Sequence, residues 1–263
     1  MRRLRLLLPL LLLLAVAPLR AQAPSVAPAA IPSRPGTLFQ VSTIGALLAG
    51  GYDGLLSFEQ LRRQGDFGLG TADALDGEMI GVDGSFYQVK ADGKAYPVDP
   101  TNTTPFAVVS FFHPDLTAEL SACDNLAALQ DQIVARFPAT NQPYAVKLTG
   151  DFDYLQTRSV PRQHPPFPPL AEVIKTQSVF EFHQVHGVLV GFWLPEYMKS
   201  LNVAGFHLHF LTADRSAGGH LLEARLTKGT LELGSARRFV MSLPPPGGAA
   251  GAANQQELQA VEK

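Results

Sequence analysis

The chain contains the stretch Gly205-Phe206-His207-Leu208-His209-Phe210-Leu211, an apolar run interrupted by two histidines that are two residues apart. Side chains at positions i and i+2 of a β-strand lie on the same face, so a strand here places both imidazoles on one side. The next residues, 212–219, are rich in Asp, Ser and Gly, which is typical of a turn, and an apolar pattern resumes over 221–226. The stretch therefore predicts a β-hairpin.

A third histidine, His220, lies at the start of the second arm of this hairpin. If the arms pair, His220 lies roughly opposite His209, with the two Cβ atoms about 5 Å apart. Three imidazoles that converge from strands leave a fourth coordination position open, which is the arrangement of a catalytic zinc site. The alternative is that His207 and His209 are ordinary polar residues of a strand, and the spacing alone leaves both interpretations open.

The composition indicates a globular protein with many turns. Of its 263 residues, 46% are hydrophobic and only 17% are charged, which excludes a disordered chain. The 23 glycines and 21 prolines favour a fold rich in strands and turns. Cys123 is the only cysteine, so an intrachain disulfide is excluded, and no histidine near it in the sequence would activate it as a nucleophile.

Residues 1–23 have the pattern of a signal peptide. Three arginines among the first five residues precede an apolar stretch, Leu6–Ala17, and Ala21-Gln22-Ala23 offers a cleavage site. We expect export to the periplasm or the medium, with retention as an anchor as the alternative, and no stable membrane insertion, because the apolar stretch is short for a membrane span. Cleavage after Ala23 would leave 17 basic and 23 acidic residues, a net charge of −6, which argues against a nucleic-acid partner.

The rest of the chain predicts an α+β fold. Residues 24–35 are rich in Pro, Ala and Ser and predict a flexible leader. We expect an N-terminal α/β subdomain over 36–160, a β-rich zinc-binding subdomain over 161–243, and a spacer and tail over 244–263. The sheets should be mixed or antiparallel, in two closely packed subdomains with a few helices and with the zinc site between them.

Periodicity and turn residues predict the individual elements. Residues 68–81 are typical of a turn that leads into a strand ending at Val82. Helices are expected over 41–49, from Ser57 with a capping box to Gln60, over 118–137 and over 195–201. Strands are expected over 86–90, 95–98, 106–112, 144–148, 154–160, 179–182, 187–193 and 231–243.

Two charged residues in apolar strands could carry chemistry. Glu78 precedes the hydrophobic strand that ends at Val82, and an acid there is costly unless it is solvated, paired or near a metal. Arg158 lies in the strand over 154–160 and is either a surface residue or a planar fork for a substrate carboxylate. Glu78 is either an exposed acid at a strand edge or an acid near a metal, and the sequence around each of the two residues leaves its alternatives open.

Several motifs in combination resemble bacterial α-acetolactate decarboxylase. The resemblance extends from about residue 38 to 239 and includes Thr71 and the proline-rich stretch after Arg158. The motifs that carry it are Gly77-Glu78, Thr157-Arg158-Ser159-Val160, Gly205-Phe206-His207-Leu208-His209-Phe210, Asp214 and Gly219-His220.

The resemblance implies a zinc enzyme, active as a homodimer, that converts 2-acetolactate to acetoin and carbon dioxide in the acetoin and butanediol pathway. It implies that Glu78 is an acid beside the metal, that Arg158 faces the substrate carboxylate and that Thr71 contacts the substrate. It also implies that the zinc ligands are His207, His209 and His220.

The resemblance further implies a second catalytic glutamate near the C-terminus. Glu257 and Glu262 are the two candidates. Because Glu257 completes a capping pattern with Asn254, we expect Glu262 to take the catalytic role. Which of Glu78 and Glu262 donates the proton is open at this level.

Two other functions compete with this one. Cupin-type metalloenzymes also carry His-x-His on a strand, but they normally have a glutamate a few residues later, and residues 210–215 contain only Asp214 as an acid. An exported metal-binding β-protein without catalytic activity is the other alternative.

Overall fold

The computed structural model describes residues 35–199 and 201–249, which belong to one compact unit over residues 32–263. The predicted signal peptide, nearly all of the predicted leader and both C-terminal glutamates lie outside the described residues. Within the described ranges, two large β-sheets dominate and the helices are short, so the expectation of sheets with few helices is confirmed. None of the helices there is long and apolar enough to cross a membrane.

The larger sheet has seven strands in the order β14-β1-β8-β3-β4-β5-β6. β1 and β14 pair in parallel, and the other neighbours pair antiparallel, so this sheet is mixed. The strands are β1 (Thr37–Val41), β3 (Phe67–Thr71), β4 (Glu78–Val82), β5 (Ser85–Val89), β6 (Ala95–Pro97), β8 (Ala107–Ser110) and β14 (Arg238–Ser242).

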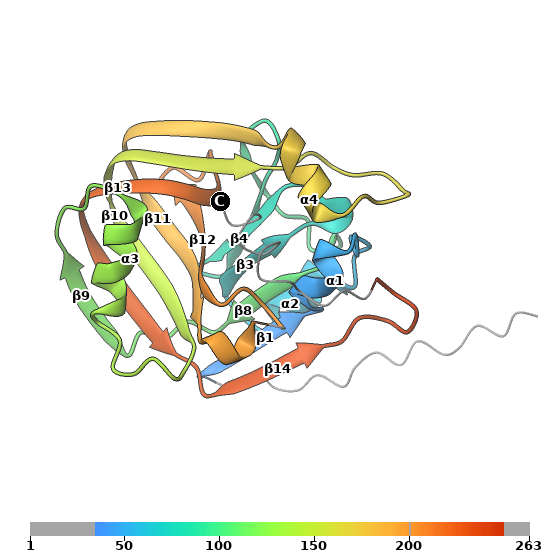
Figure 1. The fold of residues 1–263 in the computed structure, drawn as a ribbon, viewed down its shortest axis with the longest axis horizontal. Helices are drawn as coiled ribbons and strands as arrows, with labels where there is room; N and C mark the ends of the chain where they lie inside the picture. The colour runs from blue at the N-terminus through green and yellow to red at the C-terminus, as the bar shows by residue number, and fades with distance from the viewer. Residues whose placement is uncertain (1–34, 200, 250–263) are drawn as a thin grey trace, which may run out of the picture. The chain divides into compact units, whose positions relative to one another are not determined.

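The smaller sheet is antiparallel and closes on itself. β10 pairs with both β11 and β13, and β12 also pairs with both, so these four strands form a ring to which β9 adds at β13. In Figure 1 the ring and β9 lie on the left, and β3, β4 and β8 lie on the right. The strands are β9 (Leu116–Leu120), β10 (Tyr144–Ser159), β11 (Ser178–Leu194), β12 (Gly205–Thr212) and β13 (Gly218–Ser235).

Alternation along β12 assigns its side chains to two different environments. Leu208 and Phe210 belong to the core inside the ring, which α3 completes with Leu129 and Ile133. Because successive side chains of a strand point to opposite faces, His207 and His209 point out of the ring. The register of β12 therefore decides that the imidazoles face away from the ring's own core.

The outer face of the ring and one face of the larger sheet share a single hydrophobic core. It contains Val190 and Leu211 from the ring and Leu69, Ile80 and Val108 from the larger sheet. Burial of apolar surface contributes about 25 cal/mol per Å² to stability, so this core holds the two sheets against each other. The histidines on the outer face of β12 are consequently placed at this junction.

A third hydrophobic core lies under α2 on the far face of the larger sheet.

Short helices lie outside the two large sheets. The predicted capping box at the start of α2 is confirmed: Ser57 accepts a hydrogen bond from the Gln60 amide, and the Gln60 side chain accepts one from the Ser57 amide. The elements are α1 (Ile44–Leu48), α2 (Phe58–Arg62), α3 (Leu126–Val134), α4 (Leu170–Val173), the 3-10 helices η1 (Asp73–Leu75), η2 (Ile174–Thr176) and η3 (Glu196–Met198), and a small sheet of β2 (Leu56–Ser57) and β7 (Thr103–Thr104).

The predicted long helix over 118–137 is wrong in its first third. Residues 116–120 form β9, which pairs with β13, and the helix begins only after Asn125. The Asn125 side chain accepts a hydrogen bond from the Ala128 amide at 2.9 Å and caps the helix. Pairing with a distant strand overrode the local helical spacing.

The predicted turn at the start of 68–81 is also wrong, because Phe67–Thr71 is strand β3. Its glycines, Gly68 and Gly70, lie where a Cβ atom would collide with the backbone of β8. They serve close strand packing here and do not form a turn.

Several predicted strands merge or divide. The pair over 144–148 and 154–160 is one strand, β10, and the pair over 179–182 and 187–193 is one strand, β11. The strand expected over 231–243 is divided between β13 and β14. The hairpin predicted over 205–226 is confirmed, and the strands predicted over 86–90 and 95–98 also pair with each other as β5 and β6. The two subdomains stay a prediction, and their boundary at residue 160 separates strands that pair along their length.

Leu129→Ala should lower the free energy of unfolding by about 2–5 kcal/mol, because Leu129 is fully buried inside the ring and the smaller side chain leaves a cavity. Denaturant unfolding of the purified variant measures this. The matched control is Leu243→Ala at a side chain that is 69% exposed, with an expected change below about 0.5 kcal/mol. Equal effects of the two substitutions would contradict the assignment of Leu129 to the core.

Candidate metal centre

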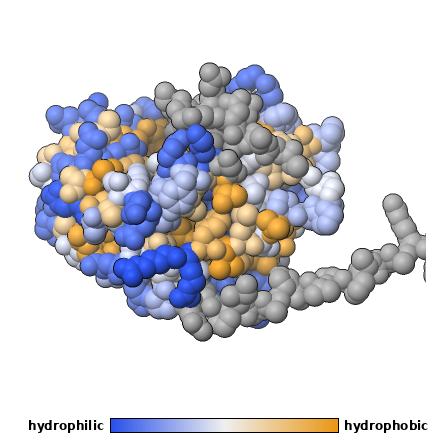
Figure 2. All heavy atoms as spheres, turned by 60° about the horizontal axis from the view of Figure 1, so that its bottom comes forward, coloured by the Kyte–Doolittle hydropathy of each residue, from blue (hydrophilic) through white to orange (hydrophobic). Residues whose placement is uncertain are grey.

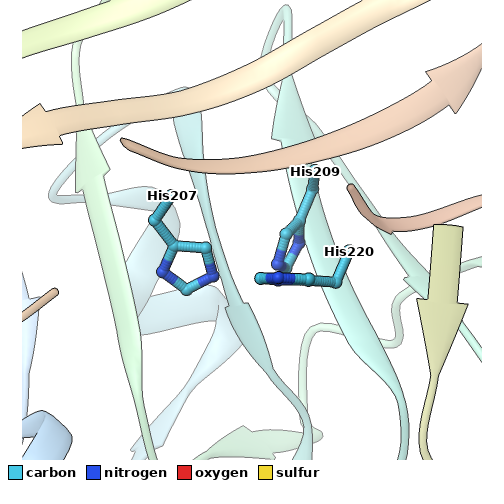
Figure 3. A group of neighbouring side chains, drawn as sticks. All are labelled: His207, His209 and His220. Carbon is cyan, nitrogen blue, oxygen red and sulfur yellow. The ribbon is translucent and has the colours of Figure 1, made fainter. Parts of the chain in front are cut away.

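The three histidines predicted to converge do so. His209 of β12 pairs directly with His220 of β13, and His207 lies two residues before His209 on the same face. The ring centroids are 5.1–5.4 Å apart, and one nitrogen of each ring lies within 4.8 Å of the others. Figure 3 shows the three rings turned toward one another.

A backbone contact fixes the orientation of His209. Its Nδ1 lies 3.0 Å from the carbonyl oxygen of Met79 on β4. Because a carbonyl oxygen only accepts, Nδ1 carries the proton and donates it, which leaves the lone pair on Nε2. That Nε2 is buried and has no hydrogen-bond partner among the described residues. Metal-binding histidines are commonly oriented in this way, with the second nitrogen donating to a carbonyl group.

Burial keeps two of the three imidazoles, those of His207 and His209, neutral. It lowers the pKa of His209 to about 3, although the hydrogen bond to Met79 acts in the opposite direction, and Arg158 lowers the pKa slightly further. Burial likewise holds the pKa of His207 well below its usual range, with His209 and Arg158 adding to the effect. Only neutral imidazole binds a metal ion, so both rings are ready to do so at neutral pH.

The donor set fits a divalent ion such as zinc. Nε2 of His209 is buried without a hydrogen-bond partner in the described part of the chain, and an unsatisfied buried polar atom is costly. A metal ion would satisfy it. Three imidazole nitrogens with a fourth position left for water or substrate is the arrangement of catalytic zinc sites, and nitrogen donors of this kind suit zinc.

Arg158 continues the row of histidines across the ring. It pairs with His220 between β10 and β13, and His220 pairs with His209, so the three side chains share the outer face. Arg158 is 4% exposed; its Nη1 donates to Oε1 of Gln177 at 3.1 Å, and its Nε has no partner among the described residues. The interpretation of Arg158 as a surface residue is therefore wrong, and a buried guanidinium stands beside the histidines.

Glu78 lies on the other side of the histidines. It is the first residue of β4, and its Oε2 is 3.5 Å from Nε2 of His209. Burial raises the pKa of the Glu78 carboxyl to about 7, against an opposing effect of Arg158. The alternative of a solvated acid at a strand edge is excluded, since the side chain is only 13% exposed.

Thr71 joins the same site from β3, where it pairs with Glu78. Its hydroxyl donates to the carbonyl oxygen of Gly77 at 2.6 Å, which leaves the oxygen free to accept. Between the two residues, Ala74 and Leu75 have φ values of 58° and 54°, in the left-handed region that is uncommon for residues other than glycine. The linker thus stores backbone strain directly beside the site.

One cavity brings these groups together. Its polar lining comes from the strands and consists of Thr71, Glu78, Arg158, His207 and His220. Its apolar lining includes Ile44 and Leu47 of α1, Leu170 of α4 and Ile174 of η2. These apolar residues and Gln177 were missed in the sequence, because no spacing or motif links them to histidines located far along the chain.

Other candidate residues lie elsewhere. Asp214 accepts hydrogen bonds from the hydroxyls of Thr212 and Ser216 and does not join the histidines, so it does not supply the acidic ligand of a cupin site. His183 and His186 are exposed, and His186 pairs with Asp151.

Comparisons with known proteins agree on one family. The family model described as alpha-acetolactate decarboxylase matches residues 38–249. A protein of that name from Methanosarcina mazei is 50% identical over 230 residues, covering 86% of this chain and 80% of the relative. Another of the same name, from Bacillus licheniformis, is 39% identical over 207 residues and covers 79% of this chain and 82% of the relative.

A solved structure agrees with these relatives. The crystal structure of alpha-acetolactate decarboxylase from Bacillus subtilis strain 168 superposes with a TM-score of 0.83 at 36% sequence identity. The match covers 86% of this chain and 99% of that structure. Neither the cupin nor the non-catalytic alternative is favoured by these findings.

His209→Ala should weaken zinc binding by more than about 100-fold, because it removes a ligand of the ion. Loss of a residue that only hydrogen-bonds to a ligand weakens metal binding by up to about 100-fold. The wild-type chain should bind about one zinc and gain thermal stability with it. Metal analysis after desalting and thermal unfolding with and without zinc measure both effects. His183→Ala, at an exposed histidine of β11, is the control and should bind zinc normally. A zinc-loaded His209→Ala protein would remove His209 from the ligand set.

Proposed function

This chain belongs to the α-acetolactate decarboxylase family and is therefore an enzyme, and we propose from this premise that it is a zinc enzyme of the acetoin and butanediol pathway. It converts 2-acetolactate to acetoin and carbon dioxide, with zinc held by His207, His209 and His220. The observation that carries the proposal is the convergence of three imidazoles, two of them held neutral by burial, beside a buried guanidinium and a buried carboxyl group.

The reaction breaks the bond between C2 of acetolactate and its carboxylate. The electron pair of that bond moves toward the neighbouring ketone oxygen, and carbon dioxide leaves. A proton added to C2 then completes acetoin. The site must therefore hold a carboxylate, stabilise negative charge that develops on an oxygen, and deliver one proton to carbon.

The metal ion would stabilise the negative charge that develops on the ketone oxygen. When bound, zinc supplies a positive charge that stabilises the developing oxyanion. The chain would contribute imidazole ligands, which carry no negative charge and so do not reduce this positive charge. The Met79 carbonyl holds the proton of His209 on Nδ1 and so presents Nε2 as the ligand atom.

Arg158 is proposed to hold the substrate carboxylate. Gln177 holds its Nη1, and its unpartnered Nε–H is left to donate to the substrate carboxylate. A guanidinium in a buried site binds a carboxylate strongly and in a fixed orientation. We propose that it orients the carboxylate so that the breaking bond aligns with the carbonyl π system.

Glu78 and Glu262 together are proposed to deliver the proton to carbon. Glu78 lines the cavity next to His209, and its carboxyl is desolvated. We assign the proton transfer to this pair of acids without dividing the roles between them. Thr71, on the strand that pairs with Glu78, is proposed to accept a hydrogen bond from the substrate hydroxyl through its side-chain oxygen.

The path of the described chain supports the role of Glu262. Ala249, the last described residue, places its Cβ about 3.2 Å from where a Cβ on Gly51 would lie, just beyond the end of α1. Because α1 supplies part of the cavity wall, the tail starts near the site. Thirteen further residues extend up to about 43 Å at about 3.3 Å each, so Glu262 is within reach of the cavity.

Export and dimerisation complete the proposal. The signal-peptide pattern of residues 1–23 supports export to the periplasm or the medium. Large hydrophobic side chains at Tyr197 and Leu243 are each 69% exposed, and hydrophobic residues gather within the face shown in Figure 2. Apolar surface of this kind supports contact with a second chain, and we propose a homodimer.

Arg158→Ala should keep its zinc and lower kcat/KM for acetoin formation from 2-acetolactate by at least about 10²-fold, because substrate placement is lost. Arg158→Lys should not restore the rate, since a lysine lacks the planar fork. Arg225→Ala, at an exposed arginine on β13, is the matched control and should leave the rate unchanged.

A colour assay for acetoin and metal analysis of the same samples provide the measurements. Wild-type zinc enzyme that forms no acetoin would reject the proposed function and leave a metal-binding protein. A wild-type rate in Arg158→Ala would reject only the role of the guanidinium.

Glu262→Gln should lower kcat by about 10²–10⁴-fold, the usual contribution of a general acid, while zinc content and unfolding temperature stay unchanged. Glu257→Gln is the matched control five residues earlier in the tail. Truncation after Ala253 should have the same effect as Glu262→Gln. Full activity of the truncated enzyme would exclude the tail from the site.

A further inference from the structure

The cavity has an apolar wall to which the proposed function assigns no role. Its polar groups lie on strands, whereas most of its apolar side chains come from short helices, among them Ile44 and Leu47 of α1, Leu170 of α4 and Ile174 of η2. α1 and α4 contact each other, so these residues form one continuous surface. Figure 1 also shows the two helices beside one another.

The chemistry of the substrate suggests what this wall contacts. 2-Acetolactate carries a carboxylate, a hydroxyl and a ketone, which the polar groups of the site recognise in the proposed function. Its remaining substituents are two methyl groups, one on C2 and one on the acetyl carbon. An apolar substituent gains about 0.8 kcal/mol per buried CH₂ group when it leaves water for an apolar surface.

Resting on that proposed function, we propose that Leu47 and Ile174 are specificity-determining residues that set the size of the alkyl substituent the enzyme accepts on C2 of its substrate. Leu47 is 7% exposed and Ile174 is half-buried, so both side chains are fixed by packing. Together they limit the space opposite the polar groups. The wild-type enzyme accordingly favours a methyl group over larger alkyl groups.

The position of this wall is itself well fixed. Gly50, just after α1, has a φ of +89°, and a Cβ there would lie 3.1 Å from the carbonyl oxygen of Phe167. The Phe167 ring also packs edge-on against Tyr52, with the ring centroids 5.3 Å apart. These contacts hold the chain that follows α1 against the loop that precedes α4. A substitution at Leu47 should therefore change the size of the cavity while α1 keeps its place.

The helix offers a matched control. Leu48 follows Leu47 and is equally buried, at 8% exposure, but it does not line the cavity. Leu47→Ala and Leu48→Ala remove the same atoms from the same helix, and alanine favours a helix at both positions. Any general loss of stability should be similar in both variants, whereas a change in specificity should occur only in Leu47→Ala.

The test compares kcat/KM of the zinc-loaded full-length enzyme for 2-acetolactate and for its homologue with an ethyl group on C2. Leu47→Ala should raise the ethyl-to-methyl ratio by about tenfold or more, because one methylene in a hydrophobic pocket changes kcat/KM by about 10–200-fold. Leu48→Ala should change the ratio by less than about twofold, as expected of an independent site.

An unchanged ratio in Leu47→Ala, or an equal rise in Leu48→Ala, would overturn the proposal. If Leu47→Ala does not fold, Ile174→Ala in η2 should give the same rise in the ethyl-to-methyl ratio. An unchanged ratio in Ile174→Ala would then overturn the proposal. Failure of the proposed function is distinguishable, because the wild-type enzyme would then decarboxylate neither substrate.

Discussion

Pairing between β12 and β13 is the constraint on which the site depends. The register that places His209 opposite His220 also places Arg158 opposite His220, so one cross-strand row carries two imidazoles and the guanidinium. A shift of one residue in β12 would turn its two histidines into the core of the ring. Leu208 and Phe210 would then face the opposite sheet. The hydrophobic alternation of β12 thus fixes the chemistry of the site together with the fold.

The site also depends on the contact between the two sheets. Ring strands supply the histidines and Arg158, whereas the larger sheet supplies Glu78 and the Met79 carbonyl. Their shared core excludes water, which lowers the pKa values of His207 and His209 and raises that of the Glu78 carboxyl. The electrostatic properties of the site are therefore a product of docking and not of any single strand.

The sequence predicted those parts that depend on short-range information. Alternation and turn residues were enough for the histidine hairpin and for the convergence of its imidazoles. The helix over 118–137 was wrong in part because β9 is a strand only through its pairing with β13. Whether Glu78 and Arg158 were buried was open for the same reason, since distant elements cover them. The apolar wall at Leu47 had no signature, because its position next to the histidines exists only in the fold.

The hydrogen bond from His209 to Met79 has a consequence for the order of maturation. The imidazole belongs to the ring and the carbonyl to the larger sheet, so the correct tautomer is selected only after the two have assembled. A chain whose two sheets have not yet docked lacks this selection. The proposed metal ion would accordingly bind after the two sheets have docked.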